Sequence, residues 1–484
     1  MNYSKLALFT LMTALLFNHS AFAQWSVSDP VSVTNEDDSY GYKSPRLGIN
    51  ADGDPMVFWM RTGSEAFFIS TLTAGSFSAP AQVPFNGLNP NLWSGSLGPN
   101  MAAFGNDVYV TFEVYGQAIY LSHSADGGVT WENPVEAFVP PAGRKATIPI
   151  VAVGPNGQPY VAYVNTNNAE QDAYYGFVKS DDFGVTFTAE VDASSSSNEE
   201  VCECCNGHIA VAENGDIYVA YRNNEANVRD IWLARSTDGG STFGSAFDID
   251  QTDWILSGCP SNGPHFAFSN DQLVTSFFSG VGSAGSGVYI SSFDSSSDDI
   301  GSTLGVQASD ETSGGQNRPR IAASGDTLAV VWQETFAGST EIGMSISTNG
   351  SLGFTSDSFR ITDSPTTQQQ PDIVYSSGSF HVVYEDPDSG TVMYQEISQG
   401  GLGIDAITEL SFTFGPNPSS DLVRIQSKEY PYNLTVINQV GQVLVSEKVT
   451  TASYNFSVVD FPSGLYCIKG ESSRASRCSI LVVR

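Results

Sequence analysis

One alternation of apolar and polar positions recurs seven times along the chain. Each copy has a Pro or Gly, a short apolar strand, a turn rich in Gly, Asp and Asn, and a second strand that ends in an aromatic residue. The copies run from Pro45 to Trp59, Pro99 to Phe112, Pro149 to Tyr163, Gly207 to Tyr221, Pro264 to Phe277, Pro319 to Trp332 and Pro371 to Tyr384. Repetition at a nearly fixed spacing predicts an array of one supersecondary unit.

A second pattern, Ser-x-Asp-x-Gly-x-Thr-aromatic, follows three of these copies. It spans Ser124 to Trp131, Ser180 to Phe187 and Ser236 to Phe243, with a degraded version at Ser347 to Phe354. Such a pattern suits a turn between two strands, because the Asp accepts backbone N–H groups and the Gly adopts a positive φ. The motif is identified as an Asp-box, and we expect its role to be structural rather than catalytic.

Each repeat therefore supplies four strands, two in the repeating pattern and one on each side of the Asp-box turn, which is one blade of a β-propeller. We predict an all-β chain whose residues 24–398 form a seven-bladed β-propeller, with a six-bladed, sialidase-type ring as the alternative. The segment from Trp25 to Val31 resembles a fourth strand, whereas the last repeat ends after its third strand near Ser398. The N-terminal segment is expected to complete the last blade and to remove the open edges.

The chain ends and the charge limit where the protein works. An apolar run from Leu6 to Phe17 followed by Ala21-Phe22-Ala23 predicts a signal peptide over residues 1–23. No later stretch reaches the roughly 20 apolar residues of a transmembrane segment. The formal net charge of −32 argues against a nucleic-acid partner, because binding phosphates needs a basic surface.

A different pattern follows residues 399–411, which read as a linker. Pro416-Asn417-Pro418 opens a run of short strands, and Gly464-Leu465-Tyr466 precedes the last hairpin. Residues 412–484 resemble the C-terminal sorting domain of type IX secretion substrates. The resemblance implies a small C-terminal β-sandwich, recognition by the type IX secretion machinery, and a secreted or cell-surface protein of a Gram-negative bacterium. Cys467 and Cys478 fall on the last two strands and are expected to form a disulfide.

Polar residues are expected to gather at one end of the propeller. Antiparallel order places the Asp-boxes on a bottom face and the repeat starts on a top face, where a central funnel can collect side chains from every blade. The positions after the starting Pro or Gly are Arg46, Asn100, Ile150, His208, His265, Arg320 and Asp372. The ends of the second strands add Arg61, Glu113, Asn165, Arg222, Glu334 and Glu385. Such a set suits recognition of an anion or a carbohydrate, or a ring of blade tips that pair with one another.

The propeller segment resembles the sialidase-like, bacterial neuraminidase repeat proteins. The resemblance implies that Arg46, Arg222 and Arg320 are candidates for gripping a carboxylate, with His208, His265, Glu334 and Asp372 nearby. Arg46 matches the family pattern loosely, because the order here is Pro-Arg-Leu rather than Arg-Ile-Pro. The Tyr–Glu pair and the acid/base Asp of true sialidases have no counterpart that the sequence identifies.

Four cysteines are expected in loops on the same top face. Cys202, Cys204 and Cys205 precede the fourth repeat, and Cys259 precedes the fifth. In an exported protein the expected outcome is a disulfide between the two loops, from Cys204 or Cys205 to Cys259. Four thiols beside His208 and His265 also suit a soft metal such as copper or zinc.

Three functions follow from these observations. The first is a secreted propeller that binds or hydrolyses acidic glycans or glycoproteins in its top-face funnel, an exo-glycosidase of sialidase type if it is an enzyme. The second is a non-catalytic surface adhesion or scaffold protein, and the third is a metal-binding or redox protein that uses the Cys-x-Cys-Cys loop. No cofactor is firmly predicted.

Overall fold

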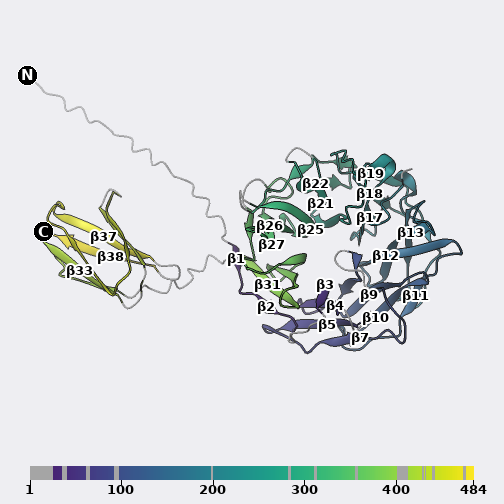
Figure 1. The fold of residues 1–484 in the computed structure, drawn as a ribbon, viewed down its shortest axis with the longest axis horizontal. Coiled ribbons are helices and arrows are strands. Elements are labelled where there is room, and N and C mark those ends of the chain that lie inside the picture. The colour runs from purple at the N-terminus through teal and green to yellow at the C-terminus, as the bar shows by residue number, and fades with distance from the viewer. Residues whose placement is uncertain are drawn as a thin grey trace, which may run out of the picture. The chain divides into compact units, whose positions relative to one another are not determined.

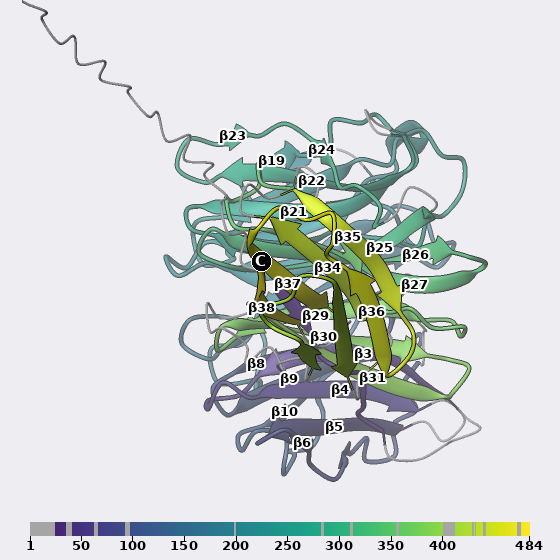
Figure 2. The same ribbon diagram turned by 90° about the vertical axis from the view of Figure 1, so that its left-hand side faces the viewer.

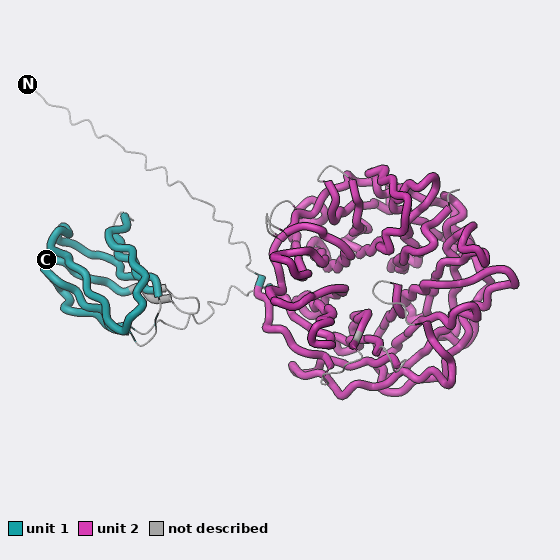
Figure 3. The backbone as a smooth tube through the Cα atoms, viewed as in Figure 1, with its two compact units in different colours: residues 1–25, 399–484 teal, residues 26–398 magenta. Residues whose placement is uncertain are grey.

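The computed structural model describes residues 25–34, 41–61, 66–91, 97–197, 200–281, 285–309, 313–354, 358–399, 412–427, 430, 432–438, 442–471 and 476–484. The predicted signal peptide and nearly all of the predicted linker lie outside them. The chain divides into two compact units, one of residues 26–398 and one made of residues 399–484 with the N-terminal residues 1–25 (Figure 3).

Seven antiparallel sheets make up the larger unit among its described residues. We number them by their first strands, which are β3 (Tyr42–Ile49), β8 (Asn100–Phe104), β12 (Arg144–Val153), β16 (His208–Val211), β20 (His265–Ser269), β25 (Gly314–Ser324) and β29 (Gln369–Ser376). The sheets follow one another around a ring, with these first strands innermost (Figure 1). The arrangement is propeller-like, with one sheet for each predicted repeat.

The remaining strands continue each sheet outward. The second strands are β4 (Pro55–Arg61), β9 (Asp107–Val114), β13 (Pro159–Asn167), β17 (Ile217–Arg222), β21 (Gln272–Ser279), β26 (Thr327–Phe336) and β30 (Ser379–Asp386). The third strands are β5 (Ala66–Thr73), β10 (Ala118–Ser124), β14 (Tyr174–Lys179), β18 (Ile231–Ser236), β22 (Gly287–Asp294), β27 (Ser339–Ser347) and β31 (Thr391–Gln399). The outer strands are β6 (Ser76–Phe77), β7 (Ala81–Val83), β11 (Val135–Phe138), β15 (Val191–Asp192), β19 (Ser245–Asp248), β23 (Asp299–Ile300), β24 (Leu304–Gly305) and β28 (Ser358–Arg360).

The seventh sheet takes its outer strands from the other end of the chain. Strands β1 (Trp25–Val27) and β2 (Val31–Ser32) both pair with β31. The N-terminal segment therefore completes the last sheet, as its fourth-strand pattern predicts. Because β31 is covered on this side, its backbone groups are not left as an open edge.

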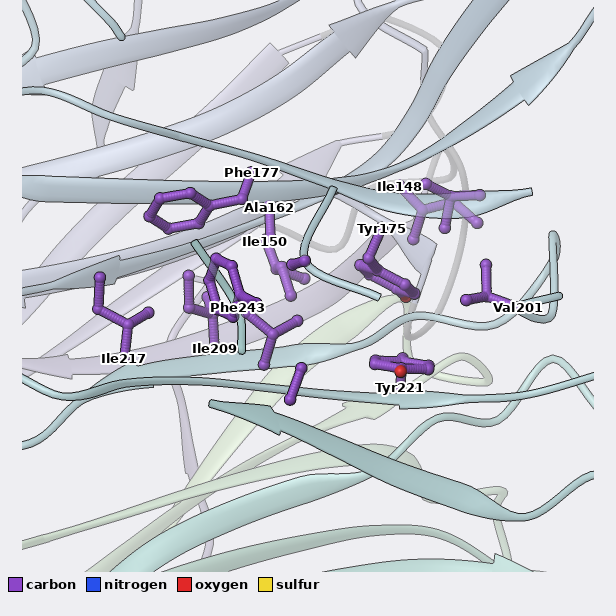
Figure 4. Packing of buried hydrophobic residues seen from close by; sticks show 14 of the residues in the cluster. Ile148, Ile150, Ala162, Tyr175, Phe177, Val201, Ile209, Ile217, Tyr221 and Phe243 are labelled. Carbon is purple, nitrogen blue, oxygen red and sulfur yellow. The ribbon is translucent and has the colours of Figure 1, made fainter. Parts of the chain in front are cut away.

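Apolar side chains fill the space between neighbouring sheets. One cluster joins the third and fourth sheets through Ile150, Phe177, Ile209, Tyr221 and Phe243, all buried (Figure 4). Similar clusters lie between other neighbouring sheets. The strands are buried on both faces, which explains why their sequences read as nearly continuous apolar runs rather than strict alternation.

The three Ser-x-Asp-x-Gly-x-Thr segments adopt one hydrogen-bonded turn between the third and outer strands. In the first, Asp126 Oδ1 accepts the Thr130 N–H at 2.7 Å and Ser124 Oγ accepts the Gly128 N–H at 2.9 Å. The same bonds recur in the turns of Asp182 and Asp238. Gly128 has a φ of 87°, which favours glycine. Hydrogen bonds to Thr lower the pKa of Asp182 and Asp238 to about 2, so these carboxylates are ionised at neutral pH.

The smaller unit has two sheets, and strands β34 to β38 are labelled in Figure 2. One contains β32 (Phe412–Gly415), β33 (Leu422–Ser427) and β36 (Ser453–Ser457), and the other β34 (Tyr432–Asn438), β35 (Val443–Val449), β37 (Gly464–Glu471) and β38 (Ser476–Val483). Val423 and Ile425 of the first sheet share one buried cluster with Leu434 and Ile468 of the second. This packing is the predicted β-sandwich.

The remaining regular elements are short. Within the part of the chain that the structure describes, the 3-10 turns η2 (Ser195–Ser197) and η3 (Glu225–Asn227) lie in connections between strands. No helix among the described residues is long and apolar enough to span a membrane.

Candidate functional site

The innermost strands enclose a cavity of about 470 Å³ on the axis of the ring. All seven first strands contribute to its lining. Five of the seven candidate ligand-binding residues line it together with Asn100, and these five are Arg46, His208, His265, Arg320 and Asp372. These positions after the repeat starts therefore lie around one cavity, which agrees with the expectation that they converge.

Several of these polar side chains bond to the next sheet around the ring. Asp372 Oδ2 accepts the Leu47 N–H at 2.9 Å, which links the seventh sheet to the first. His265 Nδ1 accepts the Ile321 N–H at 3.3 Å. The equivalent bonds run from Phe266 N–H to His208 Nδ1 and from Val151 N–H to Asn100 Oδ1. An acceptor at this position therefore satisfies a backbone N–H that a strand at the inner edge would otherwise leave unpaired.

The ends of the second strands form a second set of links between sheets. Glu113 Oε2 accepts the Ile148 N–H at 2.8 Å, and Glu385 Oε1 accepts the Ser44 N–H at 2.7 Å. Ile148 and Ser44 have φ of 53° and 54° and lie at register shifts of β12 and β3. The bulge turns each N–H toward the neighbouring sheet.

The charges in the axial cavity favour an anion. Arg320 Nε lies 3.8 Å from Asp372 Oδ1. Burial, followed by repulsion from Arg320, lowers the pKa of Arg46 to about 10, so its guanidinium still carries a charge at neutral pH. Burial also lowers the pKa of His208 to about 3, and lowers that of His265 well below its ordinary value. At neutral pH the candidate residues of the cavity therefore hold two cations, one carboxylate and two uncharged histidines.

Arg222 is not among the residues that line this cavity. Its side chain is fully buried, and its guanidinium donates to the carbonyls of Asn262 at 2.9 Å, Phe278 at 2.7 Å and Arg229. It also lies 5.3 Å from the ring centroid of Trp254. The three arginines that the sialidase resemblance suggests thus do not line one cavity, because Arg222 joins the fourth sheet to the fifth.

Glu334 is also placed by local bonds. Its Oε2 accepts the indole N–H of Trp332 at 2.7 Å, and its other oxygen accepts the Ser309 hydroxyl. Glu334 is buried and is not one of the residues lining the axial cavity. Its carboxylate is satisfied within the sixth sheet and the segment before it.

A tyrosine–glutamate cluster exists at a place that the sequence does not indicate. Glu190 accepts hydrogen bonds from the Tyr163 hydroxyl at 3.0 Å and the Tyr174 hydroxyl at 3.1 Å. Burial, followed by the charge of Glu190, raises the pKa of both tyrosines, which opposes formation of a nucleophilic phenolate. Tyr174 lines a cavity of about 740 Å³ that also contains Asp172, Asp192 and Glu200, and these carboxylates disfavour an anionic ligand.

A further cavity of about 620 Å³ was not predicted. Its lining includes Tyr115, Lys145, Glu170, Glu203 and Cys204. The Tyr115 side chain is exposed, and the Lys145 ammonium lies 5.5 Å from its ring centroid and 3.1 Å from Glu170 Oε1. An exposed aromatic beside charged groups suits the apolar face and hydroxyls of a sugar. The Tyr-Gly turn after β9 is the sequence signal that could have identified it.

The four cysteines before β16 and β20 come together. Cys204 and Cys259 form a disulfide with their Cα atoms 6.3 Å apart, which confirms the predicted bridge between the two loops. Cys202 and Cys205 are buried thiols. A hydrogen bond with Cys205 and burial raise the pKa of Cys202. Burial also acts to raise the pKa of Cys205, but the bond from Cys202 and the charge of Arg222 lower it overall.

The other predicted disulfide falls partly outside the described residues. Cys467, on β37, is disulfide-bonded, but the side chain of Cys478 is not described. Its pairing with Cys478 therefore stays a prediction.

Two buried carboxylates next to strands β18 and β19 of the fourth sheet lead to a pH prediction. Burial, followed by the nearby charge of Asp250, raises the pKa of Asp230 to about 7, and burial raises that of Asp250 to about 6. The folded protein holds these protons more tightly than the unfolded chain. The resulting stabilisation is present below about pH 4 and is lost as the pH rises through 6 to 7. We expect Asp250→Asn to raise the free energy of unfolding at pH 8.

Urea unfolding of both proteins between pH 4.5 and 8 measures this effect. The difference between Asp250→Asn and the unchanged protein is expected to shrink toward pH 4.5. Asp238→Asn is the control of opposite sign, because hydrogen bonds lower the pKa of Asp238. A difference for Asp250→Asn that is constant across the range would contradict the assignment.

Comparison with known proteins identifies only the end of the chain. Residues 414–484 match the secretion system C-terminal sorting domain family. No curated protein sequence is significantly similar to this chain.

Three solved structures resemble the chain weakly. A protein of unknown function from Dyadobacter fermentans DSM 18053 is 14% identical over 66% of this chain and 98% of its own, with a TM-score of 0.46. A leech intramolecular trans-sialidase is 12% identical over 78% and 71%, with a TM-score of 0.42. A PL25 ulvan lyase is 13% identical over 70% and 90%, with a TM-score of 0.40. Similarities at this level carry no argument about activity.

The C-terminal residues, in contrast, support a conclusion about where the protein is located. Its two sheets and its family match agree with the sorting domain that Pro416-Asn417-Pro418 and Gly464-Leu465-Tyr466 indicate. Residues 414–484 are a type IX secretion C-terminal sorting domain, and the protein is exported to the cell surface or secreted.

Proposed function

We propose that this protein is an exported glycan-binding β-propeller that holds the acidic group of a saccharide in its axial cavity. In this proposal each of the seven sheets is one blade, the three Asp-centred turns are Asp-boxes, and residues 1–23 are a signal peptide. Arg46 and Arg320 bind the carboxylate or sulfate, and His208 and His265 offer neutral polar contacts. Binding rather than hydrolysis is the proposed activity.

The charge of the axial cavity is the observation that supports this proposal. Arg46 and Arg320 come from the first and sixth sheets, on either side of the seventh. The seventh sheet contributes Asp372, the one acidic residue among the described residues that line the cavity. Burial, followed by repulsion from Arg320, lowers the pKa of Arg46, and a bound anion would relieve that repulsion. Arginine is suited to planar oxyanions because its donors match their geometry. The chain as a whole has a net charge of −32, so a positively charged cavity would direct an anionic ligand to this one place.

Two arginine variants test the proposal. Arg46→Met and Arg320→Met are each expected to weaken binding of a uronate-, sialate- or sulfate-containing glycan by about 10- to 100-fold, the value of one charge-assisted hydrogen bond. Binding is measured on a glycan array and then by calorimetry with the best ligand. A fluorogenic sialoside, assayed in parallel, separates binding from turnover.

A charge-removing control lies in the same cavity. Asp372→Asn keeps an oxygen that can accept the Leu47 N–H but removes the negative charge, so it is expected to bind the anion at least as tightly. Unchanged affinity in both arginine variants, with the fold intact, would exclude the axial cavity. Glycan binding would then be assigned to the cavity lined by Tyr115, with Tyr115→Ala as the deciding variant.

A non-catalytic scaffold or adhesion protein is the second candidate. The hydrogen bonds between neighbouring sheets favour it, because Asn100, His208, His265 and Asp372 each use one acceptor to join two sheets. Polar residues used in this way need no ligand. Absence of binding to any glycan on the array would leave this candidate in place of the first.

A further inference from the structure

The four cysteines before β16 and β20 form a compact sulfur cluster. The four Sγ atoms all lie within 4.8 Å of one another, although three come from one loop and Cys259 from another. Cys202 Sγ is 3.6 Å from Cys204 Sγ. In a tetrahedral zinc–thiolate site, bonds of about 2.3 Å place neighbouring sulfurs about 3.8 Å apart. The spacing of the sulfurs is therefore close to that of a metal site.

The backbone holds both loops in place around these sulfurs. Cys202 N–H donates to the Arg222 carbonyl at 2.8 Å, and the Tyr175 hydroxyl donates to the Cys205 carbonyl at 2.9 Å. The second loop meets the first at Gly263, where an added Cβ would lie 1.6 Å from the Asn206 carbonyl oxygen. Only glycine allows this approach. The cluster is thus fixed by the packing of the fourth and fifth sheets, so that little chain entropy would be lost on binding an ion.

Two arginines supply the charge that a thiolate cluster needs. Arg222 and Arg229 are both buried, and both act electrostatically on Cys205. Arg229 Nε donates to the Leu256 carbonyl, whereas its Nη1 is buried without a hydrogen-bond partner among the described residues. Four thiolates around a divalent ion carry a net charge of −2. Two guanidiniums neutralise that charge, whereas a monovalent ion such as copper(I) would leave −1.

We propose that the reduced form of this cluster binds one divalent, zinc-class metal ion through Cys202, Cys204, Cys205 and Cys259. The Cys204–Cys259 disulfide blocks the site until it is reduced. A dithiol reductant reduces it by thiol–disulfide exchange, which leaves two protein thiols and one oxidised reductant. Binding of M²⁺ by the four thiols then releases four protons. Cys259 is exposed, so that its side chain can separate from Cys204 without disturbing the core.

Metal titration of the full chain tests the proposal. The protein is reduced with a dithiol under anaerobic conditions, freed of reductant, and titrated with Zn²⁺, Cd²⁺ and Co²⁺. We expect one ion per chain, loss of four reactive thiols, a Cd²⁺–thiolate absorption band and a tetrahedral Co²⁺ spectrum. The oxidised protein is expected to bind at least about 100-fold more weakly.

Variants distinguish this site from surface binding. Cys259→Ser changes an exposed ligand and is expected to fold while weakening Cd²⁺ binding by at least about 10-fold. Cys202→Ser and Cys205→Ser should do the same, with circular dichroism checking that they fold. Cys467→Ser is the control outside the cluster and should retain the stoichiometry. Failure of the folded, reduced protein to bind Cd²⁺, closure of a second disulfide in preference to binding, or equal binding by the oxidised protein would overturn the proposal.

Discussion

Deletion of residues 24–34, which removes β1 and β2, is expected to abolish cooperative folding of the larger unit. The reason is that the seventh sheet would lose the strands that cover β31, and the pairing of Val31 with Tyr394 would disappear. Val33, which is fully buried in the cluster between the seventh and first sheets, would be lost as well. An uncovered β31 would present a row of unpaired backbone groups, and such edges promote aggregation.

Size-exclusion chromatography and urea unfolding followed by tryptophan fluorescence measure the result. The truncated chain is expected to elute as aggregates or to unfold at a urea concentration well below that of the intact chain. Deletion of residues 400–484 is the matched control, because it removes the separate C-terminal unit, and it should leave the main unfolding transition in place. A truncated chain that stays monomeric with an unchanged midpoint would show that β1 and β2 are dispensable.

Arg222→Met is expected to lower the free energy of unfolding by at least about 4 kcal/mol. The change leaves the buried carbonyls of Asn262 and Arg229 and the partly buried carbonyl of Phe278 without their donor. Each buried unpaired acceptor costs about 1 to 3 kcal/mol. The contact of the guanidinium with the Trp254 ring would also be lost. Lysine cannot replace this arrangement, because one ammonium does not reproduce the planar fork of an arginine.

The same exchange at an exposed arginine provides the control. Arg424→Met removes a hydrogen bond to Ser453 on the surface of the C-terminal unit and is expected to change stability by less than about 1 kcal/mol. Urea midpoints and slopes of both variants give the comparison. A loss below about 1 kcal/mol for Arg222→Met would mean that water enters and satisfies the three carbonyls.

The contacts of Arg222 limit how far function can be inferred from the polar positions of the repeats. Glu113, Glu385 and Arg222 occupy equivalent positions at the ends of second strands, and all three bond to the backbone of the next sheet. Their shared position thus reflects how neighbouring sheets are joined. Arg46 and Arg320 differ, because an arginine at the position after the repeat's starting Pro, which lies inside β3 or β25, cannot accept a backbone N–H. That difference is why the proposed ligand site rests on these two residues.

The sequence by itself determined the repeating strands, the completion of the seventh sheet by Trp25 to Val31, and the sorting domain. These features depend on the order of residues within short segments. Apolar runs between turn residues predict strands wherever they occur, and an unpaired strand edge leaves backbone groups that pair with another strand. The seven repeats correspond to seven sheets for the same reason. Ser-x-Asp-x-Gly-x-Thr likewise closes its turn through bonds within a few residues, as in Asp126 and Thr130.

Only the tertiary structure decided what the polar side chains do. Arg222 finds its acceptors up to 56 residues away, and Glu190 meets Tyr163 and Tyr174 on neighbouring strands. Cys204, and not its neighbour Cys205, faces Cys259 for disulfide formation. A hydrogen bond or a disulfide depends on distances of a few ångströms between separate sheets. The pattern of residue types sets which groups approach the axis, but the packing of the sheets sets which atoms meet.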